Sequence, residues 1–358
     1  MKLPRLLSPL VGRLVRWSPA IRLLSGVDPR VRFVEVDVGG IPYKAAEVIK
    51  AGLFTDRTNN ISFLSGRRLV PHVSWQYESN ETVGDSKNHL VTGAIRLPLK
   101  FRRVHAPVAS LLTGGGGNHN YFHWMCDCLP RIQILQAAFP DVRDAMYWVP
   151  DLSRAFQRDT LGALGLKQDQ LLSSADATFL RTDRGFAVSP PIPDPECVPR
   201  WVPHFLRETF LPHAAPRAFG PRVFISREDT FYGRRLLNET HVAQVLVQEG
   251  FQVCRLSELS FAEQVALFSA ARLVVTVHGA GLTNLVFCQK GAEIHELFAD
   301  SYQPQMYRQI AAHMDLLHVP VACETVAAPG VLRAADVRLS DSQLAEIVAR
   351  SRRLSQNS

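Results

Sequence analysis

The sequence predicts an α/β protein made of two α/β halves joined by a linker. Apolar runs of strand length alternate with helical stretches along most of the chain, which is the pattern of sheets covered by helices. Six prolines between residues 190 and 203 interrupt the alternation and cannot form regular structure throughout. Two halves on either side of such a linker would form a cleft, a common place for a ligand.

The domain boundaries are predicted from this linker. We place an N-terminal α/β domain at residues 31–215 and a C-terminal α/β domain at residues 216–335. A basic segment, residues 1–30, precedes them, and a helix with a tail, residues 336–358, follows them. The chain of 358 residues is long enough for two domains of ordinary size.

The composition is globular, with 46% hydrophobic and 20% charged residues. The net charge of +7, from 40 basic and 33 acidic residues, is compatible with an anionic ligand. The arginines are dispersed and no RNA- or DNA-binding signature is present, which disfavours nucleic acid as a partner. The six cysteines form no C-x-x-C pair, which predicts reduced thiols in a cytoplasmic protein.

The N-terminal segment is basic and amphipathic. Residues 1–24 carry five basic side chains and no acidic one, with apolar residues at helical spacing. Arginines interrupt the apolar core that a secretory signal needs, and no apolar run reaches the length of about 18 residues that spans a membrane. Such a helix can lie on anionic lipid, at the inner face of the cell membrane. The alternative is a terminal helix that packs on the protein or frays.

The first half of the chain contains strand and helix patterns in alternation. Strands are predicted at residues 31–38, 109–113, 145–149, 178–181 and 186–189, and helices at residues 43–51, 119–138 and 153–166. Asn118 is the expected cap of the helix at 119–138, and residues 55–100 are irregular with scattered short strands.

The second half alternates more regularly. Strands are predicted at residues 222–226, 252–256, 273–277, 292–298 and 317–321, and helices at residues 201–210, 238–249, 261–272, 282–287, 302–314 and 342–354. This order predicts a mainly parallel sheet with helices between its strands.

A glycine-containing loop, His278, Gly279, Ala280, Gly281 and Leu282, joins the apolar strand at 273–277 to the helix after it. The helix start leaves backbone N–H groups free, and its dipole favours an anion. Small residues let a ligand approach the backbone, and a diphosphate suits the carboxyl end of a parallel strand. One alternative is a tight turn alone. Another, an esterase oxyanion loop, needs a G-x-S-x-G elbow that the chain lacks.

Arginines follow the first strand of the second half. Arg227 leaves the carboxyl end of that strand and is expected at the same edge as His278. Arg234 and Arg235 come next, and Asn238, a further candidate for binding the donor, lies near the start of the following helix. Guanidinium groups pair with phosphate oxygens, although exposed arginines also simply solvate a surface. Only one of the two adjacent arginines is expected to face the cleft.

A third signal is the segment after four glycines at residues 114–117. His123 and Asp127 are four residues apart, on one face of a helix, and His119 lies one turn earlier. An aspartate beside an imidazole fixes its tautomer and raises its basicity, as a general base requires. The alternative is a helix with a satisfied polar face. The glycine run favours the functional interpretation. A run of glycines destabilises a packed domain, so it is expected only where the chain needs flexibility or a close approach.

These three segments, in this order, resemble glycosyltransferase family 61. The family pattern contains an N-x-x-H-W/D-x-x-D segment, matched by residues 120–127 with Leu129 and Pro130 after it. An isR…gRrlxNE segment is matched by residues 225–227 and 233–239, and an HGAGLtN…F…viEL segment by residues 278–297. The resemblance covers roughly residues 105–300.

The resemblance implies a GT-B fold, in which two Rossmann-like domains face each other across a cleft. It implies an inverting enzyme that transfers a sugar from a UDP-sugar to a glycan or lipid-linked glycan acceptor. Bacterial members look like cytosolic enzymes of capsular or other surface polysaccharide synthesis, whereas eukaryotic members are luminal and membrane-anchored. Because no anchor is predicted here, we expect the bacterial kind.

The resemblance also implies roles for individual residues. No apolar strand ends in a D-x-D triplet, so we expect no metal and no cofactor besides the UDP-sugar substrate. Arg227, Arg234 and the amides of residues 279–282 would stabilise the leaving diphosphate, and Glu296 would accept hydrogen bonds from ribose hydroxyls. His123 and Asp127 are the candidates for the base, and which of them takes the proton is open. The alternative function is a non-catalytic nucleotide- or polyanion-binding protein on the same scaffold.

Overall fold

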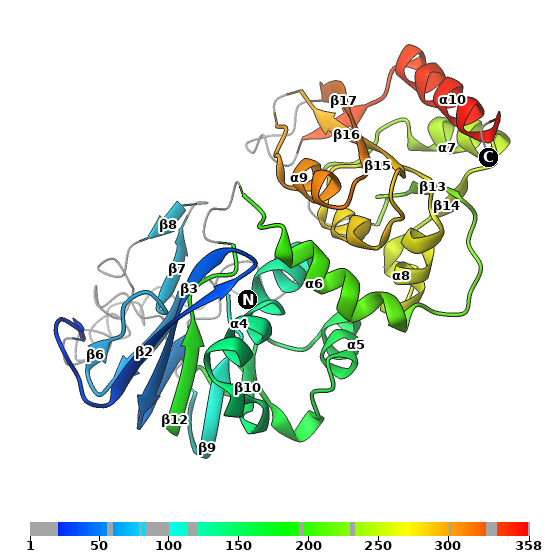
Figure 1. The fold of residues 1–358 in the computed structure, drawn as a ribbon. Coiled ribbons are helices and arrows are strands. Elements are labelled where there is room, and N and C mark those ends of the chain that lie inside the picture. The colour runs from blue at the N-terminus through cyan, green and yellow to red at the C-terminus, as the bar shows by residue number, and fades with distance from the viewer. Residues whose placement is uncertain are drawn as a thin grey trace, which may run out of the picture. The chain divides into compact units, whose positions relative to one another are not determined.

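The computed structural model describes residues 21–55, 60–78, 81–83, 100–113, 120–192, 197–229, 233–300, 302–326 and 335–356. The chain divides into two compact units between Pro195 and Glu196, each with its own sheet (Figure 1). The predicted boundary near residue 215 lies after a helix that the observed division assigns to the second unit. The basic segment 1–20 and the glycine run 114–117 lie outside the described residues.

The first unit is built on one large sheet. Its described strands are β1 (Arg22–Leu23), β2 (Val31–Val38), β3 (Ile41–Ile49), β4 (Ala51–Thr55), β5 (Asn60–Ser65), β6 (Arg68–Leu69), β7 (Trp75–Glu78), β8 (Glu81–Val83), β9 (Phe101–Ser110), β10 (Met146–Val149), β11 (Leu171–Ser173) and β12 (Phe179–Val188). Strands β12, β9, β10 and β11 are parallel neighbours in that order, and β12 also pairs antiparallel with β3 and β4. The unit is therefore α/β on one side of β12 and a mainly antiparallel sheet on the other.

The predicted helix at residues 43–51 is wrong, because this segment forms β3 and the start of β4. Gly39 and Gly40, both with positive φ, turn the chain so that β3 pairs antiparallel with β2 along its whole length. The other edge of β3 pairs with β12. A short apolar run fits either a helix or a buried strand, and here pairing partners on both edges decide for the strand.

Two further predictions in this unit need adjustment. The strands expected at residues 178–181 and 186–189 are one strand, β12, whose register against β9 shifts between Thr182 and Arg184. The strand expected at residues 109–113 begins earlier, since β9 starts at Phe101. Bulges of this kind join segments that look separate in the sequence.

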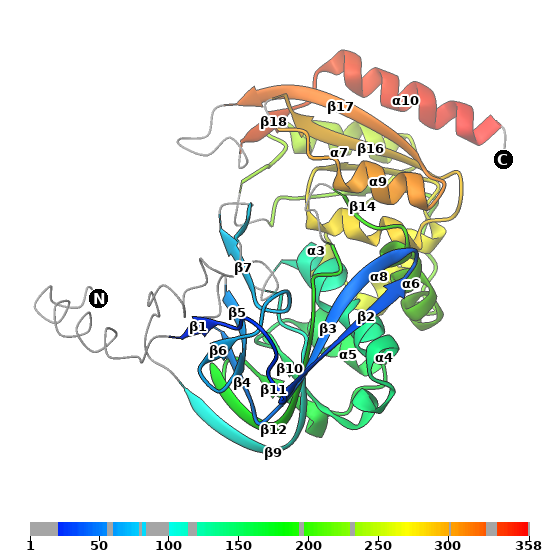
Figure 2. The ribbon, with the colours of Figure 1, turned by 60° about the vertical axis from the view of Figure 1, so that its left-hand side comes forward.

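The helices of the first unit cover its parallel strands (Figure 2). They are α3 (Tyr121–His123), the π-helix η2 (Trp124–Cys128), α4 (Arg131–Ala138), the 3₁₀ helix η3 (Pro140–Asp144), α5 (Ala155–Ala163) and the 3₁₀ helix η4 (Gln168–Gln170). The helix predicted at residues 119–138 is thus interrupted, since the N–H of Leu129 donates to the carbonyl of Trp124, five residues earlier, at 3.1 Å. Asn120 caps α3 by accepting from the N–H groups of Phe122 and His123; the expected cap, Asn118, lies outside the described residues.

The second unit is a mainly parallel α/β unit. Its described strands are β13 (Arg222–Ile225), β14 (Gln252–Cys254), β15 (Leu273–Val277), β16 (Glu293–Ala299), β17 (Leu317–Val326) and β18 (Asp336–Arg338). Its helices are α6 (Trp201–Phe210), α7 (Glu239–Gln248), α8 (Phe261–Ala270), α9 (Met306–His313) and α10 (Asp341–Gln356), with 3₁₀ helices η5 (Leu211–His213), η6 (Leu256–Glu258) and η7 (Ala280–Phe287). The predicted alternation is confirmed, with ends shifted by a few residues.

The strand order of this unit fixes where a ligand would bind. The sheet runs β14-β13-β15-β16-β17-β18, and only β18 is antiparallel to its neighbour among these described strands. In chain order this is the 2-1-3-4-5 arrangement of a doubly wound sheet, followed by an edge strand. The order reverses at β13, whose two neighbours β14 and β15 follow it in the chain. Ligands of such sheets bind at the carboxyl ends of the strands beside this point.

Each unit has a separate hydrophobic core. In the first unit, Val48, Phe63, Trp148 and Leu180 belong to one buried cluster. In the second, side chains of α7 and α10 pack on one face of the sheet around Val275, while α8 and α9, which both contact η7, lie on the other face (Figure 2). No helix among the described residues is both long enough and apolar enough to cross a membrane.

A pair of glycine substitutions tests the packing of the first unit. A Cβ atom at Gly185 would lie 2.6 Å from the Cβ of Ala51 and 2.9 Å from the ring of Phe63. We expect Gly185→Ala to lower the free energy of unfolding by about 1–3 kcal/mol through overpacking. Gly162→Ala is the control, because nothing lies within 4 Å of the added atom and alanine favours helix α5. Urea unfolding followed by tryptophan fluorescence compares them, and equal stability would contradict the packing described.

Candidate functional site

The site in the second unit forms where β13 and β15 end. These strands are parallel neighbours, with Ile225 opposite Thr276 in the ladder. The residues just past them, Arg227 and His278, therefore emerge at the same edge of the sheet. A Cβ atom built on Gly279 would lie 1.7 Å from Nη1 of Arg227, so the guanidinium rests directly on the backbone of the loop. This placement agrees with the geometry predicted from the strand ends.

The small residues of the loop have a different purpose from the one expected. The space beside Gly279 holds the Arg227 guanidinium, and the space beside Gly281 holds the Leu256 side chain, 2.5 Å from where a Cβ atom would lie. Neither glycine adopts the left-handed backbone conformation, since Gly279 is extended, with φ of 176°. Glycine is required at these positions for close packing within the protein, rather than to leave room for a ligand at the same points.

Arg227 is an arginine without a carboxylate partner among the described residues. Its Nε donates to the carbonyl of Arg234 at 3.3 Å. The nearby carboxylate of Glu239 instead accepts from the backbone N–H of Arg227 and from the hydroxyl of Ser226. Burial, followed by the charge of Arg234, lowers the pKa of Arg227 to about 10. A bound anion would relieve both effects.

Arg234 and Arg235 point in different directions. Arg234 has a left-handed backbone, with φ of 57°, and lines a small cavity together with His278 and Tyr302. Its buried Nε has no hydrogen-bond partner in the described part of the chain. Arg235 is exposed and pairs with Asp336 at 3.0 Å. Of these two arginines, Arg234 is therefore the one that adds its charge to the site of Arg227 and His278.

The backbone of the loop supplies further donors. The N–H groups of Gly279, Ala280 and Gly281 have no hydrogen-bond partner among the described residues, whereas that of Leu282 donates to the carbonyl of Gly279 at 3.0 Å. The helix they begin, η7, is a 3₁₀ helix. Leu282 was predicted to offer its amide to a ligand, but the first turn of η7 already uses it. Three amides remain beside the two arginines.

His278 belongs to a buried chain of three side chains. Its Nδ1 lies 2.6 Å from Oε1 of Glu296, and Oε2 of the same carboxylate lies 2.7 Å from Nε2 of His318. Glu296 is fully buried, so the expected contact with ribose hydroxyls is not open to it. Its carboxylate instead orients His278. His318 was missed from the sequence, where it is one histidine in a short apolar strand.

The charge state of His278 is set by its surroundings. Burial, the largest effect, lowers its pKa; hydrogen bonding to Glu296 and the charge of Glu296 oppose this, and the charges of Arg234 and Arg227 add to it. The ring stacks on Phe298 with centroids 5.5 Å apart. Because Nδ1 donates to a carboxylate, the neutral ring presents an acceptor at Nε2. Protonation would turn Nε2 into a donor suited to a phosphate oxygen.

Asn238 does not face this site. Its amide donates to the carbonyl of Leu339 at 2.8 Å, and its side-chain oxygen accepts from the N–H of the same residue at 3.2 Å. The side-chain amide and oxygen of Asn238 therefore both bond to Leu339 and connect the start of α7 to the segment before α10. A direct contact between Asn238 and a ligand, as predicted, does not fit this arrangement.

A second candidate site lies in the first unit, where α3 meets the π-helix. Nδ1 of His123 is 2.5 Å from Oδ2 of Asp127, and both side chains are partly exposed. Burial lowers the pKa of His123, but the hydrogen bond and charge of Asp127 together outweigh it, so the pKa is raised. This is the pairing expected of a base and its orienting carboxylate. The third candidate, His119, lies outside the described residues.

The described residues contain no group of three or more histidine, cysteine, aspartate or glutamate side chains placed to hold a metal ion. All six cysteines are free thiols, and five of them are buried. Metal-independent chemistry stays a prediction.

The segments that carry both sites are related to known proteins. Residues 121–295 match the family Glycosyltransferase 61. The matched range contains His123, Asp127, Arg227, Arg234 and His278, and it agrees with the family named by the sequence resemblance. Glu296 is the first residue after it, and His318 lies further along the chain.

Curated relatives are animal enzymes named protein O-linked-mannose beta-1,4-N-acetylglucosaminyltransferase 2. The chain is 37% identical to the Tetraodon nigroviridis protein over 106 residues, which is 27% of this chain and 18% of that protein. It is 33% identical to the Bos taurus protein over 112 residues, 30% of this chain and 19% of that protein. It is 36% identical to the Homo sapiens protein over 95 residues, which is 24% of this chain and 16% of that protein. The chain thus spans less than a fifth of the length of these relatives.

The two histidines should titrate on opposite sides of the ordinary histidine pKa of 6.5. NMR of protein with labelled histidines, assigned through His123→Gln and His278→Gln, would show His123 above this value and His278 below it. A shift of both in the same direction would contradict the environments described. By linkage, the contribution of His123 to stability is present below pH 6.5 and is lost as pH rises through its folded pKa. For His278, stability is lost as pH falls below 6.5, because the unfolded chain takes up the proton first.

Proposed function

We propose that the protein is a glycosyltransferase that transfers a sugar from a UDP-sugar to a glycan acceptor. The observation that carries the proposal is the Arg227 guanidinium resting on Gly279 without a carboxylate partner among the described residues. Arg234 adds a second charge, and the three loop amides add donors. This set of donors suits the two phosphates of a nucleotide diphosphate.

The donor would bind at the carboxyl edge of the second sheet. Its diphosphate would lie against Arg227, Arg234 and the amides of residues 279–281. His278, held by Glu296, would donate from Nε2 once the diphosphate raises its pKa. As the sugar leaves, negative charge builds up on the β-phosphate, and these fixed donors stabilise it more strongly than the ground state. No metal ion is needed in this scheme.

The acceptor would be activated in the first unit. In an inverting transfer, the acceptor hydroxyl oxygen forms a bond to the sugar C1 while the bond from C1 to the diphosphate breaks. The electron pair of the broken bond stays on UDP, and the hydroxyl proton passes to a base. His123, with its pKa raised by Asp127, is the proposed base. This scheme requires the two units to face each other, as in a GT-B fold.

The biological role is a separate proposal. A bacterial surface polysaccharide, with a glycan or lipid-linked glycan as acceptor, follows from the sequence resemblance alone. The curated relatives are animal enzymes whose names give N-acetylglucosamine as the sugar and O-linked mannose as the acceptor, so they add no support for a bacterial role. Release of UDP from a UDP-sugar in the presence of acceptor tests the activity. UDP binding without such release would favour the non-catalytic alternative.

The donor site is tested by one pair of arginine substitutions. Arg227→Ala should weaken UDP binding about 10- to 150-fold, the value of a charge-assisted hydrogen bond of about 1.5–3 kcal/mol. Arg235→Ala is the control, because it also removes one positive charge, but from an exposed arginine paired with Asp336. This substitution should change the affinity for UDP less than about twofold. Titration calorimetry with UDP measures both. Equal affinities in the two folded variants would remove Arg227 from the site.

The proposed base, His123, is tested by a substitution of its partner Asp127 that keeps the side-chain shape. Asp127→Asn keeps the shape of the side chain but removes the charge that supports His123, so turnover should fall about 10²- to 10⁴-fold with UDP affinity unchanged. His123→Ala should give a similar loss, and the double variant little more, because the pair acts as one unit. Asp159→Asn, at an exposed position of the same unit, is the matched control.

The outcome also separates catalysis from structure. A structural role for the pair predicts a lower melting temperature with normal turnover of the folded fraction. Melting temperature, UDP affinity and turnover are therefore measured on the same preparations, and normal turnover in both variants would place the base elsewhere.

A further inference from the structure

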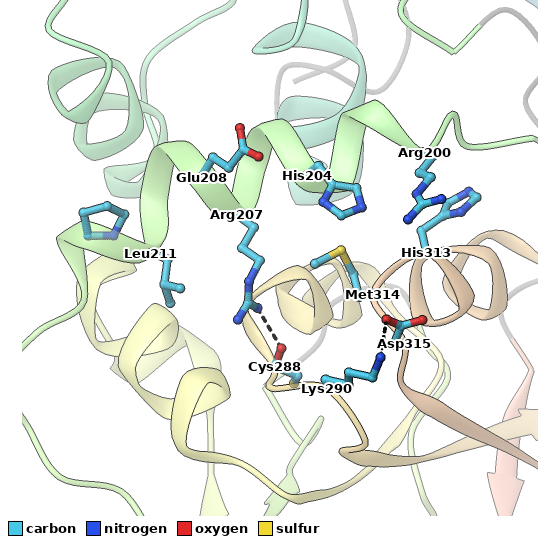
Figure 3. Close-up of a pocket in the computed structure, with 11 residues that line it drawn as sticks. Arg200, His204, Arg207, Glu208, Leu211, Cys288, Lys290, His313, Met314 and Asp315 are labelled. Atoms are coloured by element: carbon cyan, nitrogen blue, oxygen red, sulfur yellow. Dashed lines mark hydrogen bonds and ion pairs between the residues drawn. The ribbon is translucent and has the colours of Figure 1, made fainter. Parts of the chain in front are cut away.

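A cavity of about 710 Å³ opens in the second unit (Figure 3). It lies between α6, the residues after η7 and the turn after α9. Cys288 and Lys290 precede β16, and Asp315 precedes β17, where Gly291 donates its N–H to the Asp315 carbonyl at 2.8 Å. These residues sit at the amino ends of the strands, so the cavity is distinct from the proposed donor site.

The charges that face this cavity are mainly positive. Lys290 is neutralised by Asp315 at 3.1 Å, but Arg200 and Arg207 form no ion pair with any described residue. Nη1 of Arg207 donates to the carbonyls of Val286 and Cys288 at 2.9 and 2.7 Å, which holds the side chain in place without neutralising its charge. The cavity thus holds two cations that an anion would stabilise.

The second acidic lining residue does not change this balance. In Figure 3 the carboxylate of Glu208 projects from α6 on the side away from Arg207, while Arg207 and His204 point toward the cavity. A carboxylate placed in this way leaves the two arginines without a counterion in the described part of the chain.

Two histidines, His204 and His313, form part of the cavity wall. Nε2 of His204 is buried and has no partner among the described residues. Because water does not reach this atom, it lies behind the surface of the cavity and carries a desolvation penalty. His313 lies beside Arg200 and donates from Nε2 to the carbonyl of Val198 at 2.9 Å. Its ring is thereby fixed at the wall of the cavity.

We propose that this cavity is a binding site for a phosphate-bearing molecule. A phosphate group carries up to two negative charges and several acceptor oxygens, which matches the two cations Arg200 and Arg207 better than the single charge of a carboxylate does. The volume falls within the range of about 300–1,000 Å³ that is typical of small-molecule sites. Leu211 and Met314 add apolar wall for the remainder of the ligand.

The phosphate could belong to a soluble ester or to a phospholipid headgroup, and the experiment separates these sources. Inorganic pyrophosphate serves as the soluble probe, in titration calorimetry with the full chain. Phosphatidylcholine vesicles with and without phosphatidic acid serve as the lipid probe, in flotation. Because the donor site would also bind pyrophosphate, all variants carry Arg227→Ala, and neither UDP nor turnover is used as a readout.

The matched pair is Arg200→Glu and Arg308→Glu. Both arginines are exposed in the second unit and both changes alter the net charge equally, but Arg308 lies outside the cavity. We expect Arg200→Glu to weaken binding of the active probe at least about tenfold and Arg308→Glu less than about twofold. Arg200→Gln, a second variant, removes the charge without reversing it; it should also weaken binding and covers the case in which the charge reversal lowers the melting temperature.

Binding of pyrophosphate that depends on Arg200 supports a soluble ligand, and binding only to phosphatidic acid vesicles supports a headgroup. Absence of binding by both probes would overturn the proposal. Equal weakening of probe binding by Arg200→Glu and Arg308→Glu would also overturn it, since that result indicates a general effect of net charge and not a specific site.

Discussion

The close contact between Arg227 and Gly279 is the constraint on which the candidate donor site depends. An arginine can cross the end of β15 only where the loop has no side chain, since a Cβ atom at Gly279 would collide with the guanidinium. The contact buries the charge, and burial together with Arg234 lowers the pKa of Arg227 to about 10. Glu239, a nearby acid, bonds the backbone and Ser226 rather than the guanidinium. The edge of the sheet therefore keeps a charge that a bound anion would neutralise.

Hydrogen bonds tie this edge to the rest of the second unit. Glu296 takes hydrogen bonds from His278, just past β15, and from His318 on β17, so it ties the loop to the sheet. Asn238 ties the start of α7 to Leu339. Electrostatic stabilisation of a leaving group requires such fixed donors, because mobile ones would have to reorganise during the reaction.

The 3₁₀ helix η7 connects the two features of the second unit. It begins at the amides beside Arg227, and near its other end the carbonyls of Val286 and Cys288 accept from Arg207 in the wall of the second cavity. An arginine at the carboxyl end complements the helix dipole, just as an anion does at the amino end. The first unit, with its own core, presents His123 and Asp127 where a π-helix interrupts an α-helix, a deviation that often accompanies function.

The sequence by itself determined the α/β class, the alternation in the second half and the meeting of Arg227 with His278, because parallel strands that alternate with helices bring their carboxyl ends to one edge. The tertiary structure decided what depends on distant partners. The segment at residues 43–51 became a strand because β2 and β12 pair with both its edges. Glu296 is occupied because His278 and His318, which lie on other segments, both bond to its carboxylate, and Asn238 is occupied by Leu339, which is 101 residues away. Local pattern specifies strands, helices and the edge they share, whereas the partner of a buried polar group is set by contacts that only the folded chain creates.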